Sequence, residues 1–218
     1  VSWEKKNVDK LVLDAGAGER RIKGIFKKNK YISQDFGEYK HGKDSTPPDF
    51  KGTWDKKWES DKCDILCDIT NIPLEDNSIN LITCLEVIEH LPEPVKALKE
   101  LSRIIQKDGL ILISCPNLCS PHQQPFFFYS GFSRELFQNY IPAEFDLEIE
   151  KYYEEGDFIK GHFDQLNTLS ISSNNFLIRL FLKFSIKISE IVIKFLLKIS
   201  GTKFPAGCSG FVIIYKKN

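Results

Sequence analysis

The stretch LVLDAGAGERR, residues 11–21, decides the fold. Its apolar opening predicts a short buried strand over residues 11–13, and an acid, Asp14, follows directly. Gly16 and Gly18 then form a G-x-G turn, where missing side chains let the backbone bend tightly and approach a ligand closely. We therefore expect a strand, a ligand-binding turn and then a helix.

Further strand candidates recur along the chain, with helical spacing between some of them. The sequence predicts strands over residues 30–34, 63–67, 79–84, 109–114, 145–152 and 210–215. Residues 94–106 carry an apolar stripe at helical spacing, and Lys107-Asp108-Gly109 is expected to end that helix. The alternation predicts an α/β fold: a single doubly wound, Rossmann-like, mostly parallel sheet with an antiparallel last strand.

Composition sets limits on organisation and partners. The chain has 218 residues, which fits one domain over residues 1–218, with a cofactor-binding half at 1–117 and an acceptor-side half at 118–218. Its 30 basic and 30 acidic side chains balance, so no nucleic-acid partner is expected. Six cysteines without disulfide spacing indicate a reducing cytoplasm. A zinc site is the alternative for Cys63-x3-Cys67 and Cys115-x3-Cys119, but the spacing is not the usual C-x2-C and no suitable histidine pair accompanies it, so no metal is expected. Because the chain begins at Val1, we also expect that the natural protein starts earlier.

Two more acids follow predicted strands. Asp35 ends the second strand, 19 residues after Gly16, and its carboxylate can accept hydrogen bonds from both hydroxyls of a ribose. Asp68 follows the third strand and can accept a bond from the amine of an adenine, while Ile69 packs on the ring. Since parallel strands end at one edge of a sheet, these acids and Asp14 should gather there.

The glycine pattern separates two classes of cofactor. A dinucleotide site uses G-x-G-x-x-G and sets pyrophosphate at a helix N-terminus, but Gly18 is followed by Glu19-Arg20-Arg21 without that third glycine. An acid directly before the turn suits a cationic amino-acid group better than a pyrophosphate. S-adenosylmethionine carries an ammonium and a sulfonium and no phosphate, so it is the predicted cofactor.

The residues from about 9 to 117 resemble class I methyltransferases of the large family that includes the ubiquinone-biosynthesis enzymes. The resemblance rests on the acids and glycines above, on NLITCLEVIEHL at residues 80–91 and on IIQKDG at residues 104–109. It implies that Asp14, Gly16 and Gly18 hold the methionine end of S-adenosylmethionine, Asp35 the ribose, and Asp68 and Ile69 the adenine. Glu86 would line the site after the fourth strand. Two departures stand out, Arg20 at the usual third glycine and Asn80 at the usual acid of that strand.

The acceptor-side candidates lie after the fifth strand. Residues 116–132 are aromatic and proline-rich, and resemble methyltransferases encoded among bacterial surface-polysaccharide genes. His122 and Tyr129 are the predicted catalytic residues, since either can bind an acceptor hydroxyl and a histidine can take its proton; a plain polar contact is the alternative. Arg134 is a further acceptor-side candidate. Glu89 and His90 are interpreted as residues that fix a turn.

Residues 176–200 predict a long amphipathic helix with a narrow stripe of five basic residues and one acid. Charge on nearly every turn argues against a membrane-spanning helix. Three interpretations stay open: a helix lying on an anionic membrane at the inner face, a helix that covers the sheet, and a homodimer interface.

The sequence thus predicts methyl transfer from S-adenosylmethionine to an oxygen or nitrogen of a small-molecule, sugar-linked or lipid-linked acceptor. Two alternatives remain: a dinucleotide-dependent oxidoreductase on a related fold, and a non-catalytic protein that binds the cofactor.

Overall fold

The computed structural model describes residue 3 and residues 6–38, 60–119, 122–123, 125–155, 175–200 and 210–218. Most of residues 36–62, which the sequence predicts to be a long loop, lie outside this range. The strands are β1 (Leu11–Ala15), β2 (Lys30–Asp35), β3 (Ile65–Leu66), β4 (Ile79–Leu85), β5 (Ile105–Pro116), β6 (Leu147–Glu155) and β7 (Gly210–Lys217). The α-helices are α2 (Pro94–Ile104), α3 (Ile141–Phe145) and α5 (Phe176–Ser200). Shorter turns of helix are η1 (Lys23–Ile25), η2 (Ser60–Lys62), η3 (Ile88–His90) and the π-type η4 (Leu136–Tyr140).

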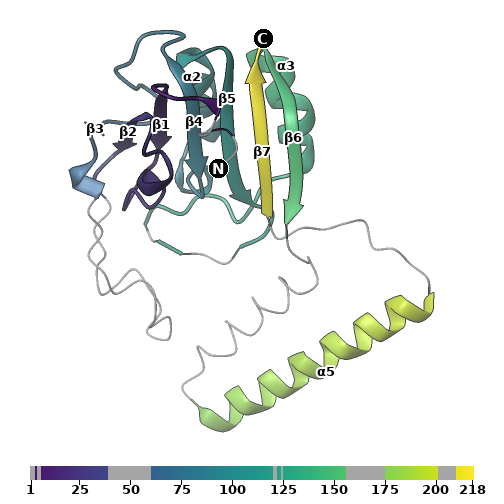
Figure 1. The fold of residues 1–218 in the computed structure, drawn as a ribbon. Helices are drawn as coiled ribbons and strands as arrows, with labels where there is room; N and C mark the ends of the chain where they lie inside the picture. The colour runs from purple at the N-terminus through teal and green to yellow at the C-terminus, as the bar shows by residue number, and fades with distance from the viewer. Residues whose placement is uncertain are drawn as a thin grey trace.

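The described strands form one seven-stranded sheet in the order β3-β2-β1-β4-β5-β7-β6. Strands β3, β2, β1, β4 and β5 pair in parallel, and β7 runs antiparallel to both β5 and β6. Figure 1 shows β7, in yellow, between β5 and β6. The predicted α/β sheet with an antiparallel last strand is therefore confirmed. Every strand predicted from the sequence is present.

The main core lies between the sheet and one layer of helices. Helix α2 buries the predicted apolar stripe, with Leu98, Leu101 and Ile104 almost wholly covered. The Ser102 hydroxyl donates to the carbonyl of Phe145 at 2.9 Å, so α2 and α3 cover the same face. On the opposite face, described residues form only a small cluster, and the apolar side chains of β5 and β7 that point there stay half-buried.

Three expectations about element boundaries were wrong. The helix of residues 94–106 ends at Ile104, and β5 begins at once with Ile105, because this buried isoleucine pairs with Ile79 of β4. The third strand is only the two residues of β3, which pair with the end of β2. Instead of a helix after the glycine turn, the chain makes turns and the short η1, since Arg20 has a left-handed φ of 56° that interrupts helical geometry.

Helix α5 coincides with the predicted amphipathic helix of residues 176–200. In Figure 1 it lies apart from the sheet. Its large apolar side chains are exposed, with Leu177 at 71% and Phe181 at 68%. Among the described residues, none of the helices combines the length and apolarity needed to cross a membrane.

Candidate functional site

A cavity of about 580 Å³ opens at the carboxyl ends of β1, β2 and β4, within the size range of small-molecule sites. Its walls come from the glycine turn, the ends of three parallel strands and the segment after β5. All seven predicted cofactor residues line it: Asp14, Gly16, Gly18, Asp35, Asp68, Ile69 and Glu86. Residues separated by about 70 positions in the sequence therefore meet at one sheet edge, as the topology requires.

The glycine turn is fitted closely against the segment after β4. Gly16 has a φ of 71°, and a Cβ there would lie 2.5 Å from a methyl carbon of Val87. Only glycine satisfies both conditions. The Gln34 side chain holds the turn from the other side, because its Oε1 accepts from the Gly16 amide at 3.2 Å and its Nε2 donates to the Cys67 carbonyl at 2.8 Å. Sequence reasoning missed both Val87 and Gln34.

Asp14 is buried at the end of β1 and held by two hydroxyl groups. Thr83 donates to its Oδ1 at 2.8 Å, and Tyr31 donates to its Oδ2. Burial raises the pKa of Asp14, and these two hydrogen bonds partly oppose that rise. The carboxylate is thus fixed in orientation at the cavity wall, with lone pairs left for a donor in the cavity.

Asp35 is the second fixed carboxylate, and backbone amides hold it. The Gly18 amide donates to Oδ2 and the Gly37 amide donates to Oδ1, each at 3.0 Å. Burial raises the pKa of Asp35, while these amide bonds lower it. Each carboxylate oxygen has two lone pairs, so both can still accept a hydroxyl from a ligand. The same contact locks the glycine turn to the end of β2.

Asp68 and Ile69 form the far wall. Asp68 Oδ1 accepts from the Thr70 amide at 2.8 Å, which shapes a turn after β3. Ile69 is 5% exposed and belongs to the main core, so it offers a fixed apolar surface to the cavity. Both features fit one edge and one face of a purine ring.

The charge of the cavity favours a cation. Its lining includes six carboxylates, those of Asp14, Glu19, Asp35, Asp68, Glu86 and Glu93, and one guanidinium, that of Arg21. A pyrophosphate would face repulsion there, whereas a ligand with an ammonium and a sulfonium would be attracted. Arg20, which stands at the usual third glycine, is absent from the lining, and its Nη1 donates to the Lys62 carbonyl at 2.8 Å.

Glu86 is the first residue after β4. It adopts a left-handed φ of 53°, and its Oε1 accepts from the Ser114 hydroxyl of β5 at 2.8 Å. The positive φ bends the chain sharply toward Val87 and the glycine turn. Glu86 therefore shapes this wall as well as adding charge to it.

The predicted catalytic residues lie beside the cavity and not in its lining. The Tyr129 hydroxyl donates to the Pro92 carbonyl at 3.2 Å, on a neighbouring hollow that also includes Pro92 and Glu93. The His122 ring packs edge-on against the ring of His90, with centroids 4.8 Å apart, and His90 itself lines the cavity. Arg134 pairs with Glu154 and is largely exposed.

The buried Glu89 and the partly buried His90 form a polar pair that sequence reasoning interpreted only as a turn. Glu89 is completely buried in η3, and that burial raises its pKa to about 8. Burial lowers the pKa of His90 to about 4, which leaves its imidazole neutral. The 3.7 Å approach of His90 Nε2 to Glu89 Oε1 is therefore a contact between two neutral groups at neutral pH and not an ion pair.

Comparisons with known proteins agree with this geometry. Residues 13–113 match a family described as a methyltransferase domain. A Mycobacterium tuberculosis protein named as a probable S-adenosylmethionine-dependent methyltransferase is 33% identical over 49 residues, which are 22% of this chain and 18% of that protein. The chain thus spans under a fifth of this curated relative.

Solved structures at low identity share the fold. The geranyl diphosphate C-methyltransferase from Streptomyces coelicolor has a TM-score of 0.54 at 10% identity, over 96% of this chain and 73% of that one. The phosphoethanolamine N-methyltransferase 2 of Haemonchus contortus has a TM-score of 0.50 at 12% identity, over 97% and 49%. The [4+2]-cyclase SpnF has a TM-score of 0.54 at 11% identity, over 97% and 76%, so the fold alone does not fix the reaction. Residues 13–113 therefore belong to a methyltransferase-domain family, and the fold of the chain is that of class I S-adenosylmethionine-dependent methyltransferases.

Proposed function

We propose that this protein transfers a methyl group from S-adenosylmethionine to an oxygen or nitrogen of a small-molecule, sugar-linked or lipid-linked acceptor. The observation that carries the proposal is that Asp14, Asp35 and Asp68 all line one acidic cavity. In this proposal Asp14 and the glycine turn receive the amino-acid end, Asp35 accepts the ribose hydroxyls, and Asp68 with Ile69 receives the adenine.

Methyl transfer requires mainly that the methyl donor and the acceptor are held in the correct relative position. When bound, S-adenosylmethionine supplies an activated methyl group on a cationic sulfur. The protein contributes orientation and the exclusion of water. Three aromatic side chains, Phe36, Phe126 and Phe128, form an apolar part of the lining. Phe36 and Phe126 pack edge to face with centroids 4.9 Å apart, which joins the end of β2 to the acceptor-side segment.

Calorimetry with S-adenosylhomocysteine and with NAD tests the cofactor assignment. We expect S-adenosylhomocysteine to bind the purified chain with a Kd of about 10 µM or tighter and NAD to show no heat of binding, because the wall is acidic. Tighter binding of NAD would instead favour the oxidoreductase alternative. Incubation with methyl-labelled S-adenosylmethionine and a panel of hydroxyl and amine acceptors then tests catalysis. Cofactor binding without turnover on the whole panel would favour the non-catalytic alternative.

We further propose that α5 binds an anionic membrane surface and brings a lipid-linked acceptor to the domain. Its support is the exposed apolar side chains of α5 together with the basic residues Arg179, Lys183 and Lys187. Each basic residue near an anionic surface contributes about 1 kcal/mol. The half-buried face of β5 and β7 is the competing place for this helix.

Sedimentation with vesicles tests the membrane proposal. We expect the chain to sediment with vesicles that contain an anionic phospholipid and not with purely zwitterionic ones. The double variant Lys183→Glu/Lys187→Glu should lose about 4 kcal/mol of attraction or roughly 1000-fold in partitioning, since each reversal replaces attraction with repulsion. Lys27→Glu/Lys28→Glu, at exposed positions before β2, makes the same charge change away from α5 and is the matched control. Equal sedimentation of the α5 variant, or a stable dimer with no vesicle binding, would contradict the proposal.

A further inference from the structure

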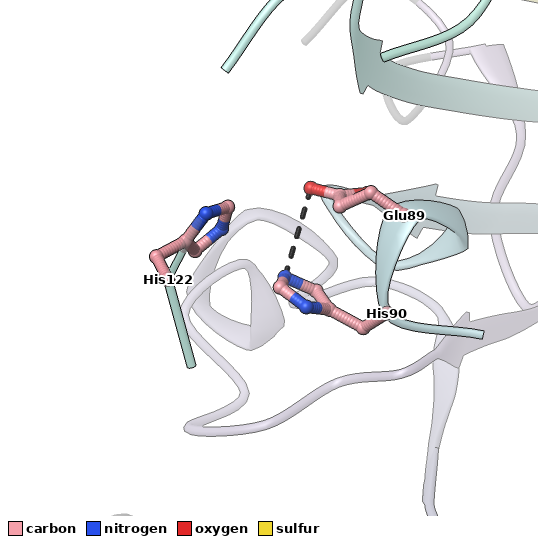
Figure 2. Close-up of side chains that lie close together, drawn as sticks. All are labelled: Glu89, His90 and His122. Atoms are coloured by element: carbon pink, nitrogen blue, oxygen red, sulfur yellow. Dashed lines mark ion pairs between the residues drawn. The ribbon is translucent and has the colours of Figure 1, made fainter. Parts of the chain in front are cut away.

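Glu89, His90 and His122 come together beside the cofactor cavity (Figure 2). Glu89 and His90 belong to η3, the turn that follows β4, whereas His122 belongs to the segment after β5. Their ligating atoms all lie within 4.8 Å of one another. Two imidazoles and one carboxylate in one place form the ligand set of several catalytic metal sites.

Glu89 supplies the observation that a packing role does not explain. The residue is completely buried, and neither oxygen of its carboxylate finds a hydrogen-bond partner in another described residue. A buried carboxyl group without a partner costs several kcal/mol, so such groups are normally paired or bound to an ion. The backbone of Glu89 is well used, since its carbonyl accepts from the amides of Phe128 and Tyr129. The carboxyl group is therefore the part of Glu89 that has no hydrogen-bond partner in another described residue.

His90 is oriented as a metal ligand. Its Nδ1 lies 2.6 Å from the Phe126 carbonyl, and because a carbonyl can only accept, Nδ1 carries the proton. The other ring nitrogen, Nε2, lies 3.7 Å from Glu89 Oε1, and neither atom has a hydrogen-bond partner in the described part of the chain. A ligating histidine commonly donates its other N–H to a backbone carbonyl in this way. At 3.7 Å the two atoms are too far apart for a hydrogen bond to each other, and a cation between them would bond to both.

His122 completes the set from a different segment. Its ring lies edge-on to His90, with centroids 4.8 Å apart, and against Phe127 at 4.9 Å. Ligand atoms around one tetrahedral zinc lie roughly 3.3 Å apart, so closing the site needs a movement of about 1 to 1.5 Å by the His122 side chain. His90 borders the cavity, which gives an ion a path of entry.

We propose that Glu89, His90 and His122 bind one divalent transition-metal ion of the zinc type on the acceptor side of the cavity. This differs from the sequence expectation of no metal, which considered the cysteines; those in the described part of the chain form no ligand group. With three protein ligands, the ion keeps a position open for an oxygen donor.

The role of the ion rests on the proposed methyl transfer. A hydroxyl of the acceptor that ligates the ion has a lowered pKa and releases its proton to water. One oxygen lone pair then forms the O–C bond to the methyl group while the C–S bond breaks, and its electron pair returns to sulfur as a neutral thioether. In this proposal His122 acts as a ligand and not as the general base.

Metal titration of the full chain tests the site without any activity measurement. Protein treated with a chelator and freed from it is titrated with Zn²⁺ by calorimetry and with Co²⁺ by visible absorption. We expect one ion per chain, a Kd of about 1 µM or tighter for Zn²⁺, and d–d bands from bound Co²⁺. Mg²⁺ should not compete, because imidazole ligands suit zinc and not a hard cation.

Single substitutions identify the ligands. His122→Ala, on a half-buried side chain, and the nearly isosteric Glu89→Gln should each weaken Zn²⁺ binding by about 30-fold or more. His41→Ala and His162→Ala, at the other two histidines of the chain, serve as matched controls and should leave it unchanged. Absence of Zn²⁺ binding by the wild type, competition by Mg²⁺, or unchanged binding by His122→Ala would overturn the site.

Cofactor binding on the same samples keeps the two proposals apart. His122→Ala should bind S-adenosylhomocysteine within about threefold of the wild type, because His122 does not line the cofactor cavity. A wild-type chain that binds Zn²⁺ but not S-adenosylhomocysteine would retain the metal site and lose the proposed function. A wild-type chain that binds S-adenosylhomocysteine but not Zn²⁺ would retain the proposed function and lose the metal site.

Discussion

Asp35→Asn lowers the affinity for S-adenosylhomocysteine by about 100-fold, the largest effect that we expect from a single change in the cavity. The carboxylate accepts two backbone amides and, in our proposal, two ribose hydroxyls. Hydrogen bonds to a charged group contribute about 1.5 to 3 kcal/mol each, and the new amide nitrogen of asparagine would face an N–H donor of Gly18 or Gly37. Calorimetric titration of both proteins measures the difference.

A neighbouring exposed acid provides the control for Asp35. Asp61 lies in η2, close to the turn at Gly37, but does not line the cavity. Asp61→Asn should therefore bind S-adenosylhomocysteine as the wild type does, and circular dichroism should show that both variants are folded. If Asp35→Asn bound as tightly as Asp61→Asn, the ribose would not be held at the end of β2.

Gly16→Ala should lower the free energy of unfolding by about 3 kcal/mol. The left-handed backbone at Gly16 costs an alanine about 1 to 2 kcal/mol, and the added methyl meets the Val87 side chain at 2.5 Å, an overlap that costs about 1 to 3 kcal/mol more. In a chain of this size the midpoint of thermal unfolding should fall by roughly 6 to 12 °C. Thermal denaturation followed by circular dichroism measures this shift.

Two companion variants separate the causes of the Gly16 effect. Val87→Ala added to Gly16→Ala removes the colliding methyl groups and should restore about half of the lost stability, leaving the backbone cost. Gly24→Ala is the matched control, because a Cβ at Gly24 meets nothing within 4 Å. Equal losses at Gly16 and Gly24 would mean that the glycine turn is not packed against Val87.

The sheet could be predicted from the sequence because its strands have strong local signals. Strands buried on both faces appear as continuous apolar runs, and the acids at their ends fall at one edge by topology alone. The missing first helix shows the limit of such signals. Gly18 and Arg20 both take a left-handed φ, and that conformation depends on how the turn is bonded to Gln34 and Asp35 across the sheet.

The candidate site was only partly predictable for the same reason. Asp14, Asp35 and Asp68 carry a spacing that marks them, whereas Gln34 and Val87 act through contacts that no local pattern reveals. Glu89 and His90 were visible as an acid next to a histidine, and His122 as a histidine after the next strand. Their meeting depends on how the segment after β5 returns to the turn after β4, which is a property of the folded chain.

The position of β7 in the sheet has a consequence for synthesis on the ribosome. This strand lies between β5 and β6, and its Tyr215 hydroxyl anchors η4 through the Phe137 carbonyl at 2.6 Å. Until residues 210–217 have been translated, the nascent chain holds two strands whose facing backbone groups have no neighbour, a state prone to aggregate. A premature stop codon just before Gly210 would therefore delete β7 and leave a product suited to capture by chaperones and to degradation.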